Sequence, residues 1–149
     1  MENEVKEKNE LIVGGFNDLV NSSKSNTKIF TNINDTKKIY NLENHVDYRL
    51  NDMKGEAIRV KEVLIKVIEK ALEEPEVDEV GNIVRDKEIK KVCILIDTEG
   101  KSYVTASKMF TNQMARFIAE FGLDAPLDIR IIEKSVKNSS NKALGFELV

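Results

Sequence analysis

A β-hairpin pattern in the middle of the chain constrains the fold most. Residues 91–96 alternate in side-chain character, residues 97–100 form a turn sequence, and residues 101–105 are again β-prone. Gly100 supplies the positive φ that a tight hairpin turn needs. The pattern therefore predicts two antiparallel strands joined by a short turn.

The pleat of this hairpin assigns its side chains to two faces. The even-numbered residues of the first strand are valine and isoleucine, so we expect them to face the core. Successive side chains point to opposite faces of a strand, which turns Lys91, Cys93 and Leu95 outward. On the return strand we expect Val104 to point inward and Tyr103 to point toward solvent.

A helix and two strands follow the hairpin. Ser107 is the expected N-cap of a helix that runs to about Phe121, and Gly122 ends it. Residues 127–134 and 144–148 then alternate as β-strands do.

Residues 57–72, before the hairpin, are rich in valine and isoleucine and predict a further strand. Their alternation changes parity between Val60 and Val63, as a β-bulge would produce. The same residues also fit helical spacing, so a helix is the alternative.

The predicted order is three strands, one helix and two strands. This number, order and helix position match an oligonucleotide/oligosaccharide-binding (OB) barrel, which has five strands in a partly open Greek key. We therefore predict a mostly β (α+β) domain over residues 28–149, with the helix between the third and fourth strands. Ferredoxin-like folds and split sheets become the better match if residues 57–72 are helical.

The N-terminal part is predicted as an extension. Residues 28–33 and 38–42 are two β-prone runs separated by a turn sequence, and we expect them to form a hairpin. Residues 1–27 predict a flexible acidic arm. A docking peptide, or a helix that folds back on the domain, is the alternative for this arm.

Composition limits the classes of function. The 149 residues allow one domain with a sizeable core, and the single cysteine excludes an intrachain disulfide. No signal peptide and no membrane-spanning run is evident, so we expect a cytoplasmic protein with no membrane partner.

The net charge of −3 is unevenly distributed. Residues 73–88 hold seven acids against Arg85 and Lys87, and they predict a long exposed loop or hairpin. The first 27 residues hold five acids and three lysines, which leaves +4 on the rest of the chain. The predicted domain is thus mildly basic outside this acidic segment.

Enzyme signatures are missing. The sequence has no glycine-rich phosphate loop, nucleophile elbow, HExxH or CxxC motif, and His45 is its only histidine. We therefore predict a binding protein without catalytic residues, metal or cofactor.

Single-stranded nucleic acid requires aromatic faces for its bases and cations for its phosphates. In an OB barrel the second and third strands carry the ligand, which places Tyr103 on the predicted binding face. The other predicted contacts are aromatic or basic: Lys91, Lys101, Lys108, Arg130, Lys134, Lys137, Lys142, Tyr40 and Tyr48.

Four stretches carry a resemblance to a known group: Lys28–Ile33, Tyr48–Asp52, Gly55–Val60 and Lys101–Phe110. On them the chain, over roughly residues 28–149, resembles small single-stranded DNA-binding proteins of tailed phages that infect Gram-positive bacteria. The resemblance implies a diverged OB fold that protects exposed strands during phage replication in the host cytoplasm. It also implies that Tyr103, Lys101 and Lys108 face the DNA.

Three functions are compatible with these sequence features. The first is sequence-tolerant binding of single-stranded DNA in phage replication, with replication proteins as further partners. The second is a protein–protein adaptor or inhibitor that uses the acidic 73–88 segment and the N-terminal arm. The third is a hydrolase or nuclease that uses carboxylates and Mg²⁺.

Overall fold

The computed structural model describes residues 25–135 and 142–149, and the chain divides into two compact units. Among the described residues, the larger unit comprises 29–67, 90–135 and 142–149, and the smaller comprises 25–28 and 68–89. The predicted arm, residues 1–27, lies almost wholly outside the described residues, so this division into arm and domain stays a prediction.

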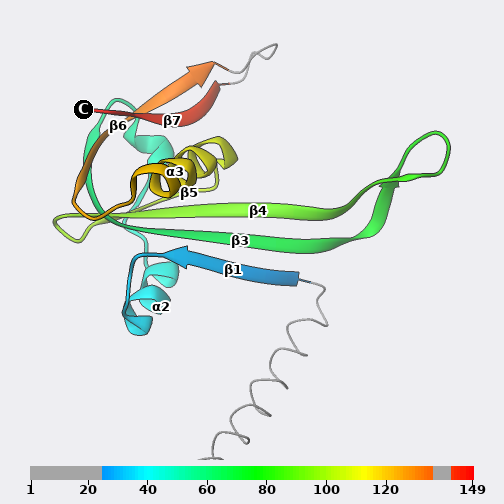
Figure 1. Cartoon of the computed structure of the whole chain (residues 1–149), viewed down its shortest axis with the longest axis horizontal. Coiled ribbons are helices and arrows are strands. Elements are labelled where there is room, and N and C mark those ends of the chain that lie inside the picture. Colours follow the sequence, from blue (N-terminus) through cyan, green and yellow to red (C-terminus); the bar gives the residue numbers. More distant parts are fainter. Residues whose placement is uncertain (1–24, 136–141) are drawn as a thin grey trace, which may run out of the picture. The chain divides into compact units, whose positions relative to one another are not determined.

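The described part is mostly β, with one mixed sheet (Figure 1). Its strands are β1 (Ser25–Thr31), β2 (Tyr48–Arg49), β3 (Ala57–Val77), β4 (Ile83–Asp97), β5 (Ser102–Thr105), β6 (Leu127–Ser135) and β7 (Lys142–Leu148). The strand order is β2-β5-β4-β3-β6-β7, and β1 also pairs with β3. The β4–β5 and β6–β7 pairs are antiparallel, whereas β2 and β5 run parallel.

The hairpin and the following helix are confirmed. In β4 and β5, Ile94 pairs with Val104, and Gly100 has a φ of 86° in the turn between them. Helix α3 (Lys108–Phe121) begins where the Ser107 side chain accepts a hydrogen bond from the Phe110 amide, and it ends at Gly122. These are the cap and stop residues that the sequence predicted.

Residues 57–72 are extended within β3, so the strand prediction is confirmed and the helical alternative is wrong. Ile58 and Val60 are buried in the same cluster as Val63 and Ile65. The core-facing parity therefore changes between Val60 and Val63, as the sequence predicted.

The predicted hairpin of residues 28–33 and 38–42 is wrong in its second strand. Residues 38–42 lie within helix α2 (Thr36–Asn44), and the Asp35 side chain accepts a hydrogen bond from the Lys37 amide at 3.0 Å. Aspartate is favoured both in turns and at helix N-caps, so the same residue supports either structure. The helix is selected because it buries Leu42 against the sheet.

The OB-like five-stranded barrel is not confirmed, because the sheet is open. Its order begins at β2 and ends at β7. β2 occupies the outer edge of β5, and β6 pairs with β3 only over residues 57–60. Farther along β3, Thr31 and Asn32, at the end of β1, bond to the backbone of Val63 and Lys61. Segments that precede β3 in the sequence thus occupy edges that a closed barrel would need.

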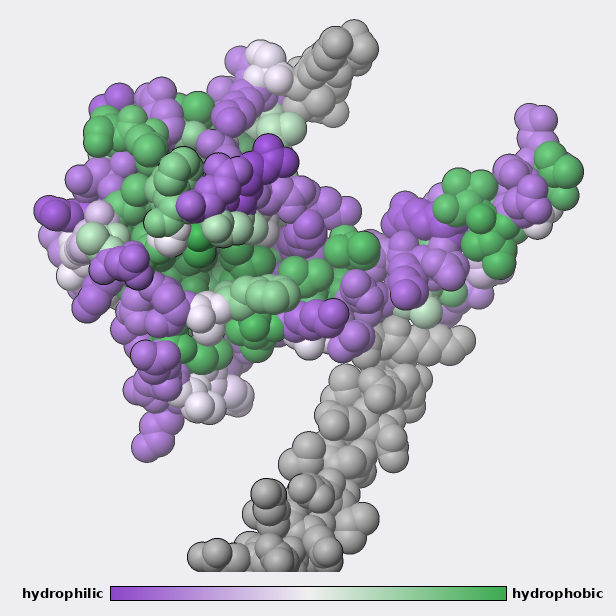
Figure 2. All heavy atoms as spheres, in the orientation of Figure 1, coloured by the Kyte–Doolittle hydropathy of each residue, from purple (hydrophilic) through white to green (hydrophobic). Residues whose placement is uncertain are grey.

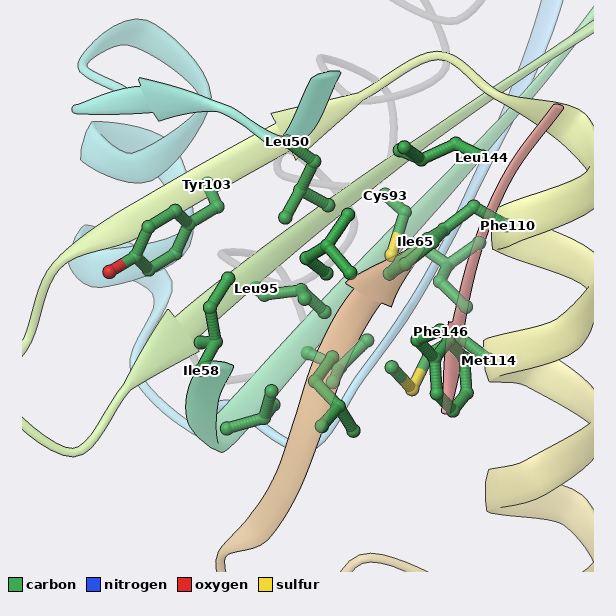
Figure 3. Close-up of a cluster of buried hydrophobic side chains, with 14 residues drawn as sticks. Leu50, Ile58, Ile65, Cys93, Leu95, Tyr103, Phe110, Met114, Leu144 and Phe146 are labelled. Carbon is green, nitrogen blue, oxygen red and sulfur yellow. The ribbon is translucent and has the colours of Figure 1, made fainter. Parts of the chain in front are cut away.

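Two clusters of buried side chains lie on opposite faces of the central strands, with α3 on one side and α2 on the other (Figure 1). The larger cluster packs α3 against one face of the sheet, including β6 and β7 (Figure 3). It contains Leu50, Ile58, Val60, Val63, Ile65, Cys93, Leu95, Tyr103, Phe110, Met114, Ile129, Ile131, Leu144 and Phe146. The smaller cluster contains Ile33, Leu42, Leu64, Ile94 and Ile96. The central strands β3 and β4 are therefore buried on both faces around residues 58–65 and 93–96.

Candidate nucleic-acid interface

The prediction that Tyr103 points to solvent is wrong. Its side chain is only 5% exposed and belongs to the larger core cluster, next to Leu95 and Leu50 (Figure 3). The Tyr103 hydroxyl donates a 2.8 Å hydrogen bond to Asp97 Oδ2, which satisfies its one polar group inside the core. A base cannot stack directly on this ring.

The error follows from the burial of β4 on both faces. Cys93 and Leu95 face the larger cluster, whereas Ile94 and Ile96 face the smaller one. The sequence prediction assumed that a strand has one buried face and one solvent-exposed face, so it assigned only the valine and isoleucine side chains to the core. Helix α2 covers the Ile94 and Ile96 face, which the sequence predicted as core. The face of Cys93, Leu95 and Tyr103, which it predicted as solvent-exposed, is covered by α3, β6 and β7.

Tyr48 is the aromatic side chain that this region presents to solvent. In β2 it pairs with Tyr103, and the two rings stack with centroids 5.3 Å apart and planes inclined by 25°. The Tyr48 side chain remains 44% exposed. Tyr103 thus supports the inner face of the Tyr48 ring, and Asp97 holds Tyr103 in place.

Two other predicted contacts lie apart from this stack. Tyr40 is 68% exposed on α2 and has no aromatic partner within the described residues. Lys91 is half-buried in β4, and its ammonium donates a hydrogen bond to Asn112 Oδ1 of α3 at 2.6 Å. Neither residue contacts Tyr48 in the described interactions.

Several predicted cations lie beside carboxylates on the surface. These pairs have N···O distances of 3.5 Å: Lys101–Glu99, Arg130–Glu147 and Lys142–Glu133. Exposed ion pairs typically contribute about 0–1 kcal/mol to stability. A phosphate that arrives at such a lysine or arginine therefore displaces the carboxylate at little cost.

The remaining predicted cations have different positions. Lys108 is exposed as the first residue of α3. Lys134 is half-buried on β6, and its side chain lies over Gly145, where a Cβ atom would come within 2.7 Å of Lys134 Cε. Lys137 lies outside the described residues.

A basic hollow of about 420 Å³ lies where β2, β5, the start of α3 and β7 meet. Its lining residues are Arg49, Asn51, Val92, Val104, Thr105, Ala106, Ser107, Lys142, Ala143 and Leu144. Two of them are cationic and none is acidic. Hydroxyl, amide and aliphatic groups form the rest of the wall.

Arg49 and the polar groups of this hollow are absent from the predicted contact list. Arg49 follows Tyr48 directly in the sequence, and that neighbour is the one local signal for it. The contribution of Asn51, Thr105 and Ser107 follows from how the β5–α3 connection meets the short 3₁₀ helix at Leu50–Met53. No local pattern indicates that meeting.

The Asp97–Tyr103 pair has shifted acidities. Burial by itself raises the pKa of Asp97, but hydrogen bonds from the Tyr103 hydroxyl and from the Lys101 and Glu99 amides outweigh burial, so the pKa is lowered. Burial, followed by the hydrogen bond to Asp97 and the charge of that carboxylate, raises the pKa of Tyr103. The pair is thus a neutral phenol donating to a carboxylate throughout the neutral range.

Within residues 25–135 and 142–149, no group of three or more His, Cys, Asp or Glu side chains is placed to hold a metal ion. Among the described helices, none is long and apolar enough to cross a membrane.

No protein-family model, curated protein or solved structure matches the chain.

Proposed function

We propose that this protein binds single-stranded DNA with little sequence preference, at the sheet edge formed by β2 and β5. The observation that carries the proposal is the exposed Tyr48 ring, stacked on Tyr103 and followed directly by Arg49 of the basic hollow. Stacking on an aromatic ring contributes about 1–3 kcal/mol per base and tolerates every base.

The cations supply the second requirement. Arg49 and Lys142 line the hollow, and Lys108 begins α3 directly after Ser107 of its wall. Neighbouring side chains of a strand point to opposite faces, so Tyr48 and Arg49 lie on the two faces of an edge strand. A DNA strand that passes over this edge meets the ring on one side and the guanidinium on the other.

The resemblance to phage single-stranded DNA-binding proteins supports the same proposal. Two of the stretches that carry it, Tyr48–Asp52 and Lys101–Phe110, contain Tyr48, Arg49, Tyr103 and Lys108. On this proposal the protein is a binding protein, not an enzyme. It acts on exposed DNA strands during phage replication in the host cytoplasm.

Titration of labelled oligo-dT tests the proposal. With three phosphates neutralised, the slope of log K against log salt is about −2 for a single strand, so affinity falls roughly 20-fold between about 50 and about 200 mM salt. Fluorescence anisotropy measures both affinities. Unchanged anisotropy at micromolar protein and low salt would contradict the proposal.

A further inference from the structure

The smaller unit contains a β-hairpin made from the far end of β3 and the start of β4, within residues 68–89. Asp78 organises its turn, because its carboxylate Oδ1 accepts hydrogen bonds from the Val80 amide at 2.9 Å and the Asn82 amide at 2.8 Å. The Asp78 amide in turn donates to the Asn82 carbonyl at 2.9 Å. The turn is therefore a defined structure that presents its flanking side chains in fixed directions.

The tip of this hairpin is apolar and exposed. Val77, Val80, Ile83 and Val84 are 59%, 84%, 65% and 66% exposed. Val77 and Ile83 are the residues next to the Asp78–Asn82 pair on the two strands, so they oppose each other across the hairpin. Figure 2 shows these hydrophobic side chains gathered around the turn. We name these four residues the hairpin tip.

Exposure of this kind is concentrated in the hairpin. Of the thirteen large hydrophobic side chains exposed among the described residues, five fall within residues 68–89. Isolated exposed hydrophobics are ordinary on a soluble protein, whereas a group at one place marks an interaction surface. The tip aliphatics therefore need a partner to cover them.

The charge around the tip identifies the chemistry of that partner. Residues 68–89 contain eight acids against three bases, Lys70, Arg85 and Lys87. One of these bases is already paired, since Arg85 Nη1 lies 3.7 Å from Glu76 Oε1. Such a field repels nucleic-acid phosphates and anionic lipid headgroups, and it attracts a basic protein surface.

We propose that the hairpin tip docks on an apolar patch of a partner protein whose rim carries lysine and arginine side chains. The four aliphatic side chains supply the affinity, because they lose water when covered. The acids along both strands steer the encounter and select against acidic partners. This surface is separate in residues and in charge from the Tyr48 and Arg49 edge.

A synthetic surrogate of the partner tests the inference with the full chain. The probe is a short fluorescent peptide of alternating leucine and lysine, and its two controls replace every leucine by serine or every lysine by glutamate. We expect the leucine–lysine peptide to bind at least about tenfold more tightly than either control. Anisotropy titration at low and moderate salt provides the affinities.

Variants assign the binding to the hairpin. Val80→Ser/Ile83→Ser/Val84→Ser should weaken peptide binding about tenfold, and Glu73→Gln/Glu74→Gln/Glu76→Gln should weaken it and flatten its salt dependence. Phe121→Ser/Leu148→Ser is the matched control, since it removes exposed hydrophobics outside residues 68–89 and should leave peptide binding unchanged. Unchanged melting temperatures show that the substitutions act on binding, because the replaced side chains are exposed.

The inference is overturned if the hairpin variants bind the peptide as tightly as the wild type does. Equal binding of the serine–lysine peptide, or binding of the tip to anionic vesicles, would also overturn it. Oligo-dT affinity is measured in the same variants and should not fall. Because peptide binding and oligo-dT binding are measured separately, failure of the docking inference can be distinguished from failure of the DNA-binding proposal.

Discussion

At the scale of single residues, the stacked tyrosines give the candidate interface its shape. Tyr48 and Tyr103 have the same chemistry, but one is 44% exposed and the other 5% exposed. Their roles therefore differ. Tyr48 offers a ring to a ligand, whereas Tyr103 fills the core and supports that ring from beneath.

Substitutions at Tyr48 should change binding more than stability. Tyr48→Ala removes the exposed stacking face, so oligo-dT affinity should fall by the equivalent of about 1–3 kcal/mol, roughly 5- to 150-fold. Tyr48→Phe keeps the ring and should retain most of the affinity. Anisotropy measures both variants, and equal loss in both would show that the hydroxyl, not stacking, contributes.

Asp97 should make stability depend on pH. Its lowered pKa means that the ionised carboxylate stabilises the fold above its unfolded-state pKa of about 3.9, and that this contribution is lost as pH falls toward the lower folded-state pKa. Asp97→Asn should cost about 1.5–3 kcal/mol at neutral pH, because it removes a charged acceptor of three hydrogen bonds.

Thermal melts of wild type and Asp97→Asn across pH test this expectation. The difference in melting temperature should be largest above about pH 5 and should narrow as the pH falls below about 4. Asp128→Asn, which changes an exposed carboxylate on β6, is the control and should show little difference at any pH. A difference that stays constant with pH would contradict the role of the Asp97 charge.

At the scale of elements, the Gln113 side chain attaches α3 to β7, because it makes the paired backbone hydrogen bonds that a neighbouring strand would make. The Gln113 amide donates from Nε2 to the Phe146 carbonyl at 2.7 Å and accepts at Oε1 from the Phe146 amide at 3.1 Å. The helix thus satisfies both the N–H and the C=O of Phe146. Phe110 and Phe146 pack edge to face beside this bond.

Gln113→Ala should therefore destabilise the fold by about 1–3 kcal/mol. The substitution leaves two part-buried backbone groups of Phe146 without partners, and an unmet buried donor or acceptor costs about this much. Urea denaturation measures the free energy of unfolding. Arg116→Ala changes an exposed residue of the same helix and should stay within about 0.5 kcal/mol of wild type. Equal effects of the two variants would contradict the role of the paired bonds.

At the scale of the whole molecule, the sheet carries a buried cluster on each face, so β3 and β4 are enclosed around residues 58–65 and 93–96. Cys93 lies in the larger cluster with no exposed surface, and burial raises the pKa of its thiol to about 12. The thiolate is the reactive form. The Cys93 thiol is therefore protected from reagents because solvent does not reach it and because it stays protonated.

Cys93 should consequently report opening of the core. In the native protein at about pH 8, we expect no labelling by a thiol reagent on the timescale on which a free thiol reacts completely. Labelling should rise with urea and follow the unfolding transition seen by circular dichroism. Rapid labelling without denaturant would show that the enclosed strands open locally. A Cys93→Ser variant, which cannot be labelled, gives the background signal.

Local sequence patterns predicted the elements whose formation depends on their own residues. The strands around residues 57–72, 91–105, 127–134 and 144–148 were identified, as was α3 with its Ser107 cap and Gly122 stop. Backbone propensity, caps and periodicity act within a few residues, so these features are readable without knowledge of the neighbours. The change in core-facing parity within β3 is likewise readable from the local sequence.

The tertiary structure alone decided which face of each strand is exposed to solvent and whether the sheet closes into a barrel. The identity of α2 depended on the apolar surface that Ile94 and Ile96 offer to Leu42. On the other face of β4, the larger cluster, which includes Leu50, placed Tyr103 inside and left Tyr48 at the edge. These outcomes depend on contacts between segments more than fifty residues apart, for which a local pattern carries no information. The β2–β5 pairing that occupies the outer edge of β5 depends on such contacts too.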